Sequence, residues 1–141
     1  MRISLDVTAV QTLSLFDQFS KVQAKDCIIE EERIVFIVKP EDLPKAIGKG
    51  GGTLHFLEQK LKKRVKIVAF DEQLVNFIKN LLYPINVVLI EEKEGIVFIT
   101  PQDSKSRGII IGKMAKNLRA MEKIVQRYFQ IKEIKVTQNG Q

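Results

Sequence analysis

The chain has 141 residues, of which 45% are hydrophobic and 28% are charged, a balance typical of a folded globular protein. Its 23 lysine and arginine residues outnumber its 17 aspartate and glutamate residues, so the net charge is +6 and a polyanionic partner is favoured. No apolar stretch approaches the roughly 18 residues that a membrane span needs. We therefore expect a cytoplasmic protein with no membrane partner.

One cysteine and one histidine leave little room for catalytic or metal chemistry. Cys27 cannot form an internal disulfide, and together with His55 it falls short of the ligand set of a structural zinc site. A Ser/His/Asp or Cys/His arrangement would have to be built around His55 alone. A nuclease would need a metal-binding cluster of carboxylates, whereas the acidic residues here fall in predicted turns and helix starts. We predict no catalytic residue, no metal ligand and no cofactor, and hence no enzyme.

The first half of the chain predicts helices and strands in a simple order. Apolar residues at helical spacing (Ala9, Val10, Leu13, Phe16 and Phe19) predict a first helix, which Asp6 or Thr8 could cap. β-branched and aromatic residues then predict a hairpin, whose second strand ends at Pro40. The predicted elements are a helix over 6–21, strands over 24–30 and 33–39, a helix over 41–47, a glycine turn, a helix over 53–63 and a strand over 64–70.

The second half repeats this order. It predicts a helix over 71–82, strands over 86–91 and 95–100 around a turn at 92–94, a segment over 104–111 that leads into a second turn, a helix over 116–129 and a strand over 131–137. The step from Gly48 to Gly112 is 64 positions and the step from Pro40 to Pro101 is 61, so the second copy carries three extra residues before its turn.

The repeated order predicts an α+β fold. We expect two domains, residues 1–70 and 71–141, each a three-stranded sheet packed against helices. Almost no linker separates them.

Each half has a short turn between two helices, over residues 48–51 (the first turn) and 112–115 (the second turn). The surrounding segments read Ile-Gly-Lys-Gly-Gly-Gly-Thr-Leu and Ile-Gly-Lys-Met-Ala-Lys-Asn-Leu. Glycine can adopt positive φ and lets another backbone approach closely. The helix that begins beyond each turn presents unpaired amides and a positive dipole end, which favour phosphate. The alternative is a plain connection between helices.

Two well-known glycine motifs are excluded by spacing. Walker A needs four residues between its first glycine and a Gly-Lys-Ser/Thr, which is absent here. The dinucleotide fingerprint needs a glycine where Thr53 follows Gly48-Lys49-Gly50. The sequence therefore gives no support for a nucleoside triphosphate or NAD site.

Basic charge gathers around both turns. Residues 45–66 hold seven basic side chains and one acidic one, Glu58, and residues 105–127 again hold seven and one, Glu122. In the second predicted helix, cations recur at steps of three or four residues, so they share one face. These cations are Lys116, Arg119, Lys123 and Arg127. A solvated helix face is the alternative interpretation, but the same bias in both halves favours binding of a polyanion.

The first turn, Gly48-Lys49-Gly50-Gly51, resembles the Gly-x-x-Gly loop of KH domains, which clamps about four nucleotides of backbone. The order of elements resembles the type II KH arrangement. A short chain with two such units is similar to the archaeal NusA-type transcription elongation and termination factors, and the resemblance covers residues 5–137. It implies single-stranded RNA as a partner, RNA polymerase as a further partner, and a role in transcription.

The second turn departs from the family pattern, because Ala115 stands where the pattern has its second glycine. Alanine is the mildest replacement and suits a helix start, but its methyl group would crowd a phosphate. Met114 is a candidate contact for a base or for a partner. By resemblance, the candidate RNA-binding residues are Lys45, Ile47, Gly48, Lys49, Gly50, Gly51, Lys60, Arg107, Gly112, Lys113, Met114, Ala115, Lys116 and Arg119.

Several alternatives stay open. Ile47, Leu54, Ile111 and Leu118 either line a groove for bases or belong to the core, and His55 either contacts RNA or is a surface histidine. Phe36 and Phe98 are expected at matched places in strands, and an RRM-like sheet that stacks bases is disfavoured. At the level of function, a KH factor in ribosome assembly or RNA processing, or a basic adaptor for an acidic protein surface, are the alternatives.

Overall fold

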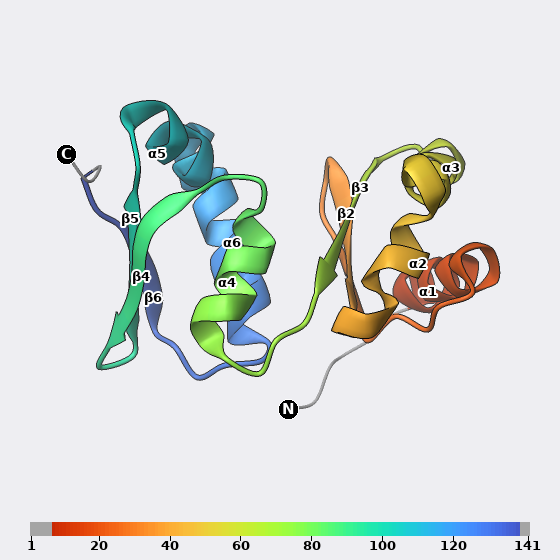
Figure 1. Cartoon of the computed structure of the whole chain (residues 1–141), viewed down its shortest axis with the longest axis horizontal. Helices are drawn as coiled ribbons and strands as arrows, with labels where there is room; N and C mark the ends of the chain where they lie inside the picture. The colour runs from red at the N-terminus through yellow and green to blue at the C-terminus, as the bar shows by residue number, and fades with distance from the viewer. Residues whose placement is uncertain (1–6, 139–141) are drawn as a thin grey trace. The chain divides into compact units, whose positions relative to one another are not determined.

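The computed structural model describes residues 7–138 (Figure 1). The chain divides between Asp71 and Glu72 into two compact units, named here the first unit and the second unit. Asp6, one of the two predicted helix caps, lies outside the described residues. The other, Thr8, lies inside the first helix, so the prediction that Thr8 caps it is wrong.

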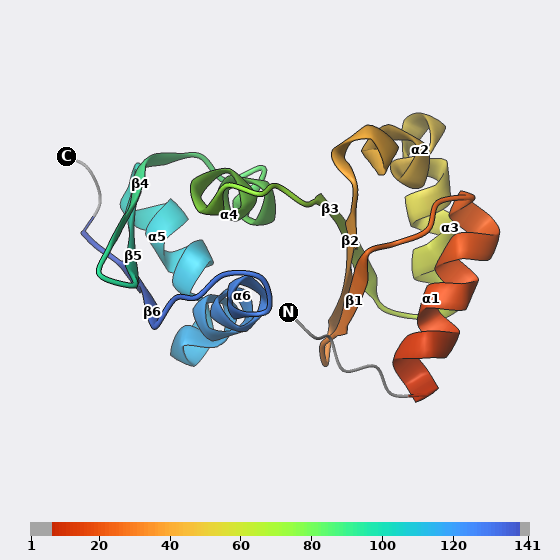
Figure 2. The same cartoon turned by 90° about the horizontal axis from the view of Figure 1, so that it is seen from below.

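The first unit has the predicted order of elements. Its strands form a sheet in the order β1-β2-β3, with β1 antiparallel and β3 parallel to the central strand β2. The helices cover one face of this sheet (Figure 2). The elements are α1 (Val7–Ser20), β1 (Asp26–Ile29), β2 (Arg33–Val38), a 3-10 turn (Pro40–Asp42), α2 (Leu43–Ile47), a second 3-10 turn (Lys49–Gly51), α3 (Gly52–Leu61) and β3 (Arg64–Ala69).

The core of the first unit lies between α1, α3 and the sheet. The rings of Phe16 and Phe36 stack with their centroids 4.2 Å apart, and Leu57 of α3 is fully buried in the same cluster. Burying side chains of this size stabilises the fold by roughly 1.5–3 kcal/mol each. Val10, predicted on the buried face of α1, is instead 52% exposed.

Two polar residues of α1 take core positions that the apolar pattern did not predict. Thr12 and Ser20 are both buried, and their hydroxyls donate to the carbonyls one turn earlier, at 2.8 Å to Thr8 and 2.7 Å to Phe16. A hydroxyl that donates to its own helix can be buried at little cost. The buried face of α1 is therefore partly polar, so the pattern of apolar residues alone does not identify all of it.

The second unit repeats the topology of the first. Its sheet has the order β4-β5-β6, with an antiparallel pair followed by a parallel pair. The elements are α4 (Leu74–Leu82), β4 (Val87–Lys93), β5 (Ile96–Pro101), α5 (Ser104–Ile111), a 3-10 turn (Lys113–Ala115), α6 (Lys116–Gln126) and β6 (Glu133–Val136). The predicted α+β fold, with two three-stranded sheets packed against helices, is confirmed.

The hairpin of the second unit differs from its prediction. Strand β4 continues through Lys93, so the chain turns at Glu94 and Gly95 rather than over residues 92–94. Both turn residues have positive φ, 54° and 84°, which suits a tight hairpin because the turn then follows the right-handed twist of the strands. Helix α4 begins three residues later and α6 ends three residues earlier than predicted.

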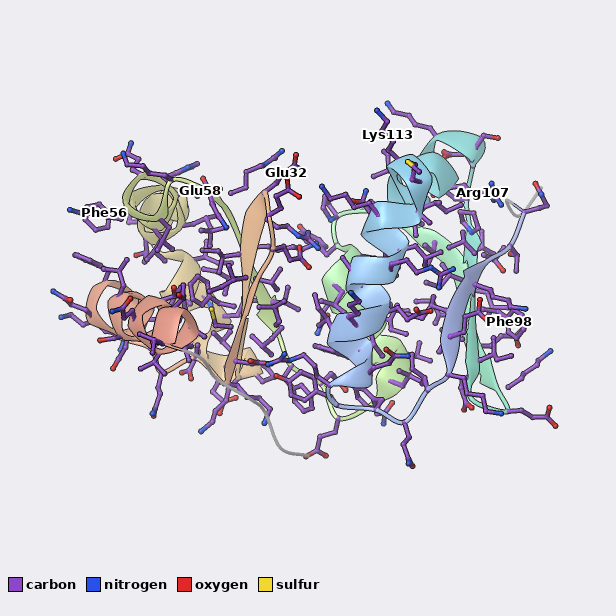
Figure 3. All side chains as sticks on the ribbon, turned by 180° about the vertical axis from the view of Figure 1, so that it is seen from behind. Glu32, Phe56, Glu58, Phe98, Arg107 and Lys113 are labelled. Carbon is purple, nitrogen blue, oxygen red and sulfur yellow. The ribbon has the colours of Figure 1, made fainter. Side chains whose placement is uncertain are left out.

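Phe36 and Phe98 do not occupy matched places. Burial alternates along β5, where Val97 and Ile99 are fully buried and Phe98 is not. Phe98 lies on the sheet face that is turned away from α6 (Figure 3). Because successive side chains of a strand point to opposite faces, an alignment that is wrong by one residue exchanges inside for outside.

The core of the second unit is built on α6. Its buried residues are Leu118, Met121, Ile124 and Val125. Tyr128, predicted inside this helix, follows its end and is half-buried, with its ring packed edge-on against Phe77 at 5.7 Å. Among residues 7–138, no helix has the length and apolar character to cross a membrane, and no group of three or more metal-ligating side chains is present.

Lys66 of β3 gives the first unit a measurable dependence on pH. Burial first, and then the nearby Arg33 guanidinium, lower the pKa of the Lys66 ammonium to about 8, while the Glu30 carboxylate raises it by a smaller amount. Between that pKa and the unfolded value, the unfolded chain binds more protons than the folded chain. The contribution of Lys66 to stability therefore rises as the pH increases through this window.

We predict that alkaline pH stabilises the wild type relative to Lys66→Met. From about pH 7 to about pH 10, the free energy of unfolding of the wild type should gain about 1 kcal/mol on that of the variant, a value discounted for partial exposure. Urea denaturation at the two pH values measures the difference. If the difference in free energy of unfolding between wild type and variant is the same at both pH values, Lys66 has the same pKa in the folded and unfolded states, and the prediction is wrong.

Candidate nucleic-acid interface

The two turns follow the same backbone path despite their different sequences. In the first turn, φ is 82° at Gly48, 61° at Gly50 and 75° at Gly51. In the second turn, the matched residues Gly112, Met114 and Ala115 have φ of 76°, 54° and 62°. All six residues have positive φ, a conformation that favours glycine, yet only four of them are glycine. The second turn therefore keeps the backbone path although Met114 and Ala115 replace two glycines.

Matched hydrogen bonds hold the two turns in this shape. The Gly48 amide donates to the Pro44 carbonyl at 3.0 Å, and the Gly112 amide donates to the Gly108 carbonyl at 2.9 Å. Three residues further on, the Gly51 and Ala115 amides donate to the carbonyls of Gly48 and Gly112, each at 3.1 Å. The turns are therefore ordered parts of the fold.

The first glycine of each turn is required by geometry. With ψ of 165° and 173°, Gly48 and Gly112 occupy a backbone region that is essentially restricted to glycine. A Cβ on Gly48 would lie 2.8 Å from the Thr53 amide nitrogen, and one on Gly112 would lie 2.6 Å from the Asn117 side chain. The Asn117 amide group fills that space and donates to the Ile109 carbonyl at 2.9 Å.

Ala115 does not suit its position in the way that the sequence suggested. It precedes α6 in the left-handed conformation, which costs a residue with a side chain roughly 1–2 kcal/mol. Met114 has the same left-handed backbone. The second turn is therefore strained at two consecutive residues, whereas the first turn has glycine at both.

The helices that follow the turns begin without a side-chain cap. Neither Gly51 before α3 nor Ala115 before α6 supplies a side-chain hydrogen bond. By contrast, Asp103 caps α5 by accepting from the Ser106 amide at 2.7 Å. The hydrogen bonds from Ser106 lower the pKa of Asp103. The amides of Gly52 and Lys116, the first residues of α3 and α6, donate to the carbonyls of Lys49 and Lys113. The start of each helix therefore suits an anion through its positive dipole end.

Most of the predicted cations are exposed near the turns. Lys49 and Lys113 stand in the turns themselves, with Lys113 labelled in Figure 3. Lys45 is exposed on α2, and Lys116 is exposed at the start of α6. Lys60 is exposed but lies eight residues along α3, about 12 Å from the helix start, with its ammonium 5.7 Å from the centre of the Phe56 ring.

Two of the predicted arginines have structural partners. Arg107 is half-buried, and its Nε donates to the Thr137 carbonyl at 3.0 Å, which ties α5 to the end of β6 (Figure 3). Arg119 donates to the Glu122 carboxylate at 2.8 Å and lies 4.0 Å from that of Glu133. The contact of Arg107 occupies one of its donors, and the carboxylates near Arg119 partly offset the positive charge that it can offer to a ligand.

The apolar residues beside the turns belong more to the core than to an open groove. Leu118 is buried, and Leu54 packs against the core cluster of the first unit. Ile47 and Ile111, each immediately before its turn, are half-buried. Ile47 can therefore contact a ligand with only part of its side chain.

The single acidic residue in each basic segment has a structural role that sequence reasoning missed. The Glu58 carboxylate accepts from the Val65 amide at 3.0 Å, and the Glu122 carboxylate accepts from the Ile134 amide at 2.7 Å. Each glutamate therefore joins the helix that follows a turn to the strand that follows this helix. The signal was present in the sequence, because Glu58 and Glu122 are 64 positions apart, like the two turns.

His55 and Arg119 occupy matched positions beside these glutamates. His55 Nδ1 lies 3.6 Å from the Glu58 carboxylate, as Arg119 pairs with Glu122. A Cβ on Gly51 would lie 3.5 Å from the His55 ring, so this ring borders the first turn. The His55 side chain is 71% exposed.

We predict that Ala115→Gly stabilises the fold. Removing the methyl group relieves left-handed strain, and after the entropy cost of glycine the free energy of unfolding should rise by about 0.5–1 kcal/mol. The matched change Gly51→Ala should lower it by a similar amount. Thermal unfolding followed by circular dichroism measures both, and a destabilised Ala115→Gly would contradict the strain.

Comparisons with known proteins identify the fold and the family. A family model described as KH domain matches residues 12–73, nearly all of the first unit. A solved structure titled "Crystal structure of APE1850" superposes with a TM-score of 0.75 at 24% identity and covers 94% of this chain and 100% of its own. It supports the fold alone.

Archaeal relatives match almost the whole chain. Proteins named "Probable transcription termination protein NusA" are 31% identical in Methanocaldococcus jannaschii, over 99% of this chain and 78% of the relative, and 32% identical in Methanococcus vannielii, over 96% and 80%. The protein of the same name in Halococcus morrhuae is 29% identical over 96% of this chain and 99% of its own length. The chain therefore belongs to the archaeal NusA-type family of KH-domain proteins.

Proposed function

We propose that the chain is a cytoplasmic, non-enzymatic protein that binds single-stranded RNA at its two turns and acts in transcription termination and elongation. Two findings support the proposal. The chain belongs to a family whose relatives are named as probable transcription termination proteins, and the first unit matches the KH domain, a fold that binds single-stranded nucleic acid through a Gly-x-x-Gly loop. RNA polymerase is the proposed protein partner.

The geometry of the first turn carries the proposal at the level of chemistry. A Cβ built on Gly50 or on Gly52 would meet no atom within 4 Å, so a phosphodiester can approach the backbone closely there. The start of α3 offers amides without a side-chain cap, and Lys49 supplies an exposed positive charge beside them. The helix dipole and the lysine then act together on one phosphate.

The second turn offers less to a phosphate. It has the same backbone path and an exposed lysine, Lys113, but it carries the side chains of Met114 and Ala115 where the first turn has glycine. These side chains keep a phosphate further from the amides of α6. We propose that the first turn provides most of the electrostatic binding to the RNA backbone.

We predict that Gly50→Asp weakens binding to single-stranded RNA about tenfold or more, because the carboxylate repels the phosphate. Gly50→Asn is the matched control, since it has nearly the same shape and no charge, and both residues tolerate the left-handed φ of 61°. Asn should weaken binding less than Asp does, because its side chain crowds the phosphate but carries no charge. Fluorescence anisotropy with a labelled RNA of about ten nucleotides measures all three proteins.

The dependence of this affinity on salt provides a second readout. If four phosphates are neutralised, the slope of log K against log salt concentration is about −3 for a single strand. Gly50→Asp should make this slope less negative by about 0.7, the value for one phosphate contact. Equal affinities for the Asp and Asn variants, or a wild-type affinity that does not change with salt, would contradict the proposed site.

The proposed place in transcription has a separate test. The tagged protein should copurify with RNA polymerase from cells of a related archaeon, and this association should be enriched over ribosomal particles. Copurification with ribosomal particles alone would favour ribosome assembly or RNA processing. The binding site at the first turn would then stand, and only its biological setting would change.

A further inference from the structure

The two turns differ most in what they expose to solvent. At the position where the first turn has Gly50, the second has Met114, whose side chain is 94% exposed. At the position where α2 has the exposed Lys45, α5 has Ile109, which is 49% exposed. Both replacements, taken at an offset of 64 residues, put an apolar side chain where the first unit has a glycine or a cation.

Met114 contributes nothing to the fold that would explain its position. Its backbone is left-handed, with φ of 54°, a conformation that methionine rarely adopts and that glycine adopts freely. At 94% exposure its side chain gains almost no burial in return. Gly50 shows that the same backbone path forms without a side chain. A strained residue that stabilises nothing inside the protein is a candidate for contact with something outside it.

The charge around Met114 indicates the chemistry of that contact. From Lys105 to Met121 the chain has five cations and no acidic residue. Lys113, directly before Met114, is exposed at the same turn (Figure 3). A partner with both negative charge and flat apolar surfaces suits an exposed methionine among cations. Single-stranded RNA is such a partner, because it presents phosphates and unstacked bases. The thioether of methionine packs well against aromatic rings.

We infer that Met114 is a nucleobase contact. A base of the bound strand packs on the Met114 side chain while Lys113 meets a neighbouring phosphate. The two turns then divide the recognition of one class of ligand, because the first turn contacts the RNA backbone and the second contacts a base. This inference rests on the proposed binding of single-stranded RNA.

The test separates bases from phosphates by using two ligands. One is a labelled single-stranded RNA of mixed sequence and about ten nucleotides, and the other is an abasic ribose-phosphate oligomer of the same length and charge. Binding of both to the full chain is measured at one salt concentration. Met114→Gly should weaken binding to the RNA about fivefold and should not weaken binding to the abasic oligomer.

Three controls make the result specific. Met114→Leu keeps an apolar side chain and should retain RNA affinity within about twofold, whereas Met114→Gln should lose affinity like the glycine variant. Thermal unfolding should show Met114→Gly to be at least as stable as the wild type, because glycine relieves the left-handed strain. A loss of affinity in a more stable protein cannot come from unfolding.

Each outcome decides between the inference and the function on which it rests. Equal losses on the two ligands, or no loss on the RNA, would overturn the base contact. Gly50→Asp should weaken binding to both ligands, because both carry phosphates. A wild type that binds neither ligand would overturn the proposed function instead. If Met114→Gly leaves RNA binding intact but abolishes copurification with RNA polymerase, the exposed methionine is a protein contact and the inference is wrong.

Discussion

The structure of both units depends on one backbone constraint, the extended positive-φ conformation of Gly48 and Gly112. In this conformation the place of a Cβ is taken by the residue five positions later, which is Thr53 in one unit and Asn117 in the other. The chain can therefore leave α2 or α5 and enter the next helix within four residues, with the helix start at the surface. A side chain at either glycine would collide with the residue five positions later and move the following helix.

A second constraint anchors that helix to its sheet. Glu58 and Glu122 are the only carboxylates in their basic segments, and each accepts the amide at the start of the last strand. Charge-assisted hydrogen bonds of this kind are stronger than neutral ones. Each unit thus keeps one acidic residue among its cations for a structural reason, while the remaining side chains of the segment leave it strongly positive. The matched position before each glutamate holds His55 in one unit and Arg119 in the other, so the two units differ in permanent charge beside similar turns.

The order of elements could be predicted from the sequence because the hydrophobic periodicity and the proline and glycine breaks are strong in both halves. Contacts that depend on three-dimensional proximity could not. The hydrogen bond from Arg107 to the Thr137 carbonyl joins residues 30 positions apart, and nothing local marks either of them. The left-handed backbone of Ala115 could not be predicted because alanine usually indicates a helix. The conformation becomes clear only from the structure, where Ala115 has the same left-handed backbone as Gly51 of the first turn. Phe98 was matched to Phe36 by mistake, because a shift of one residue along a strand changes the face without changing the kinds of residue in the strand.

The central claim is that single-stranded RNA contacts the backbone of the two turns and the helix starts beyond them. The most direct measurement is a titration of the isotopically labelled full chain with a short single-stranded RNA, followed through backbone amide resonances. The account predicts that the largest changes fall on residues 48–53 and 112–117, with smaller changes on the helix-free sheet face that carries Phe98. Changes concentrated on that sheet face, with both turns unaffected, would contradict it.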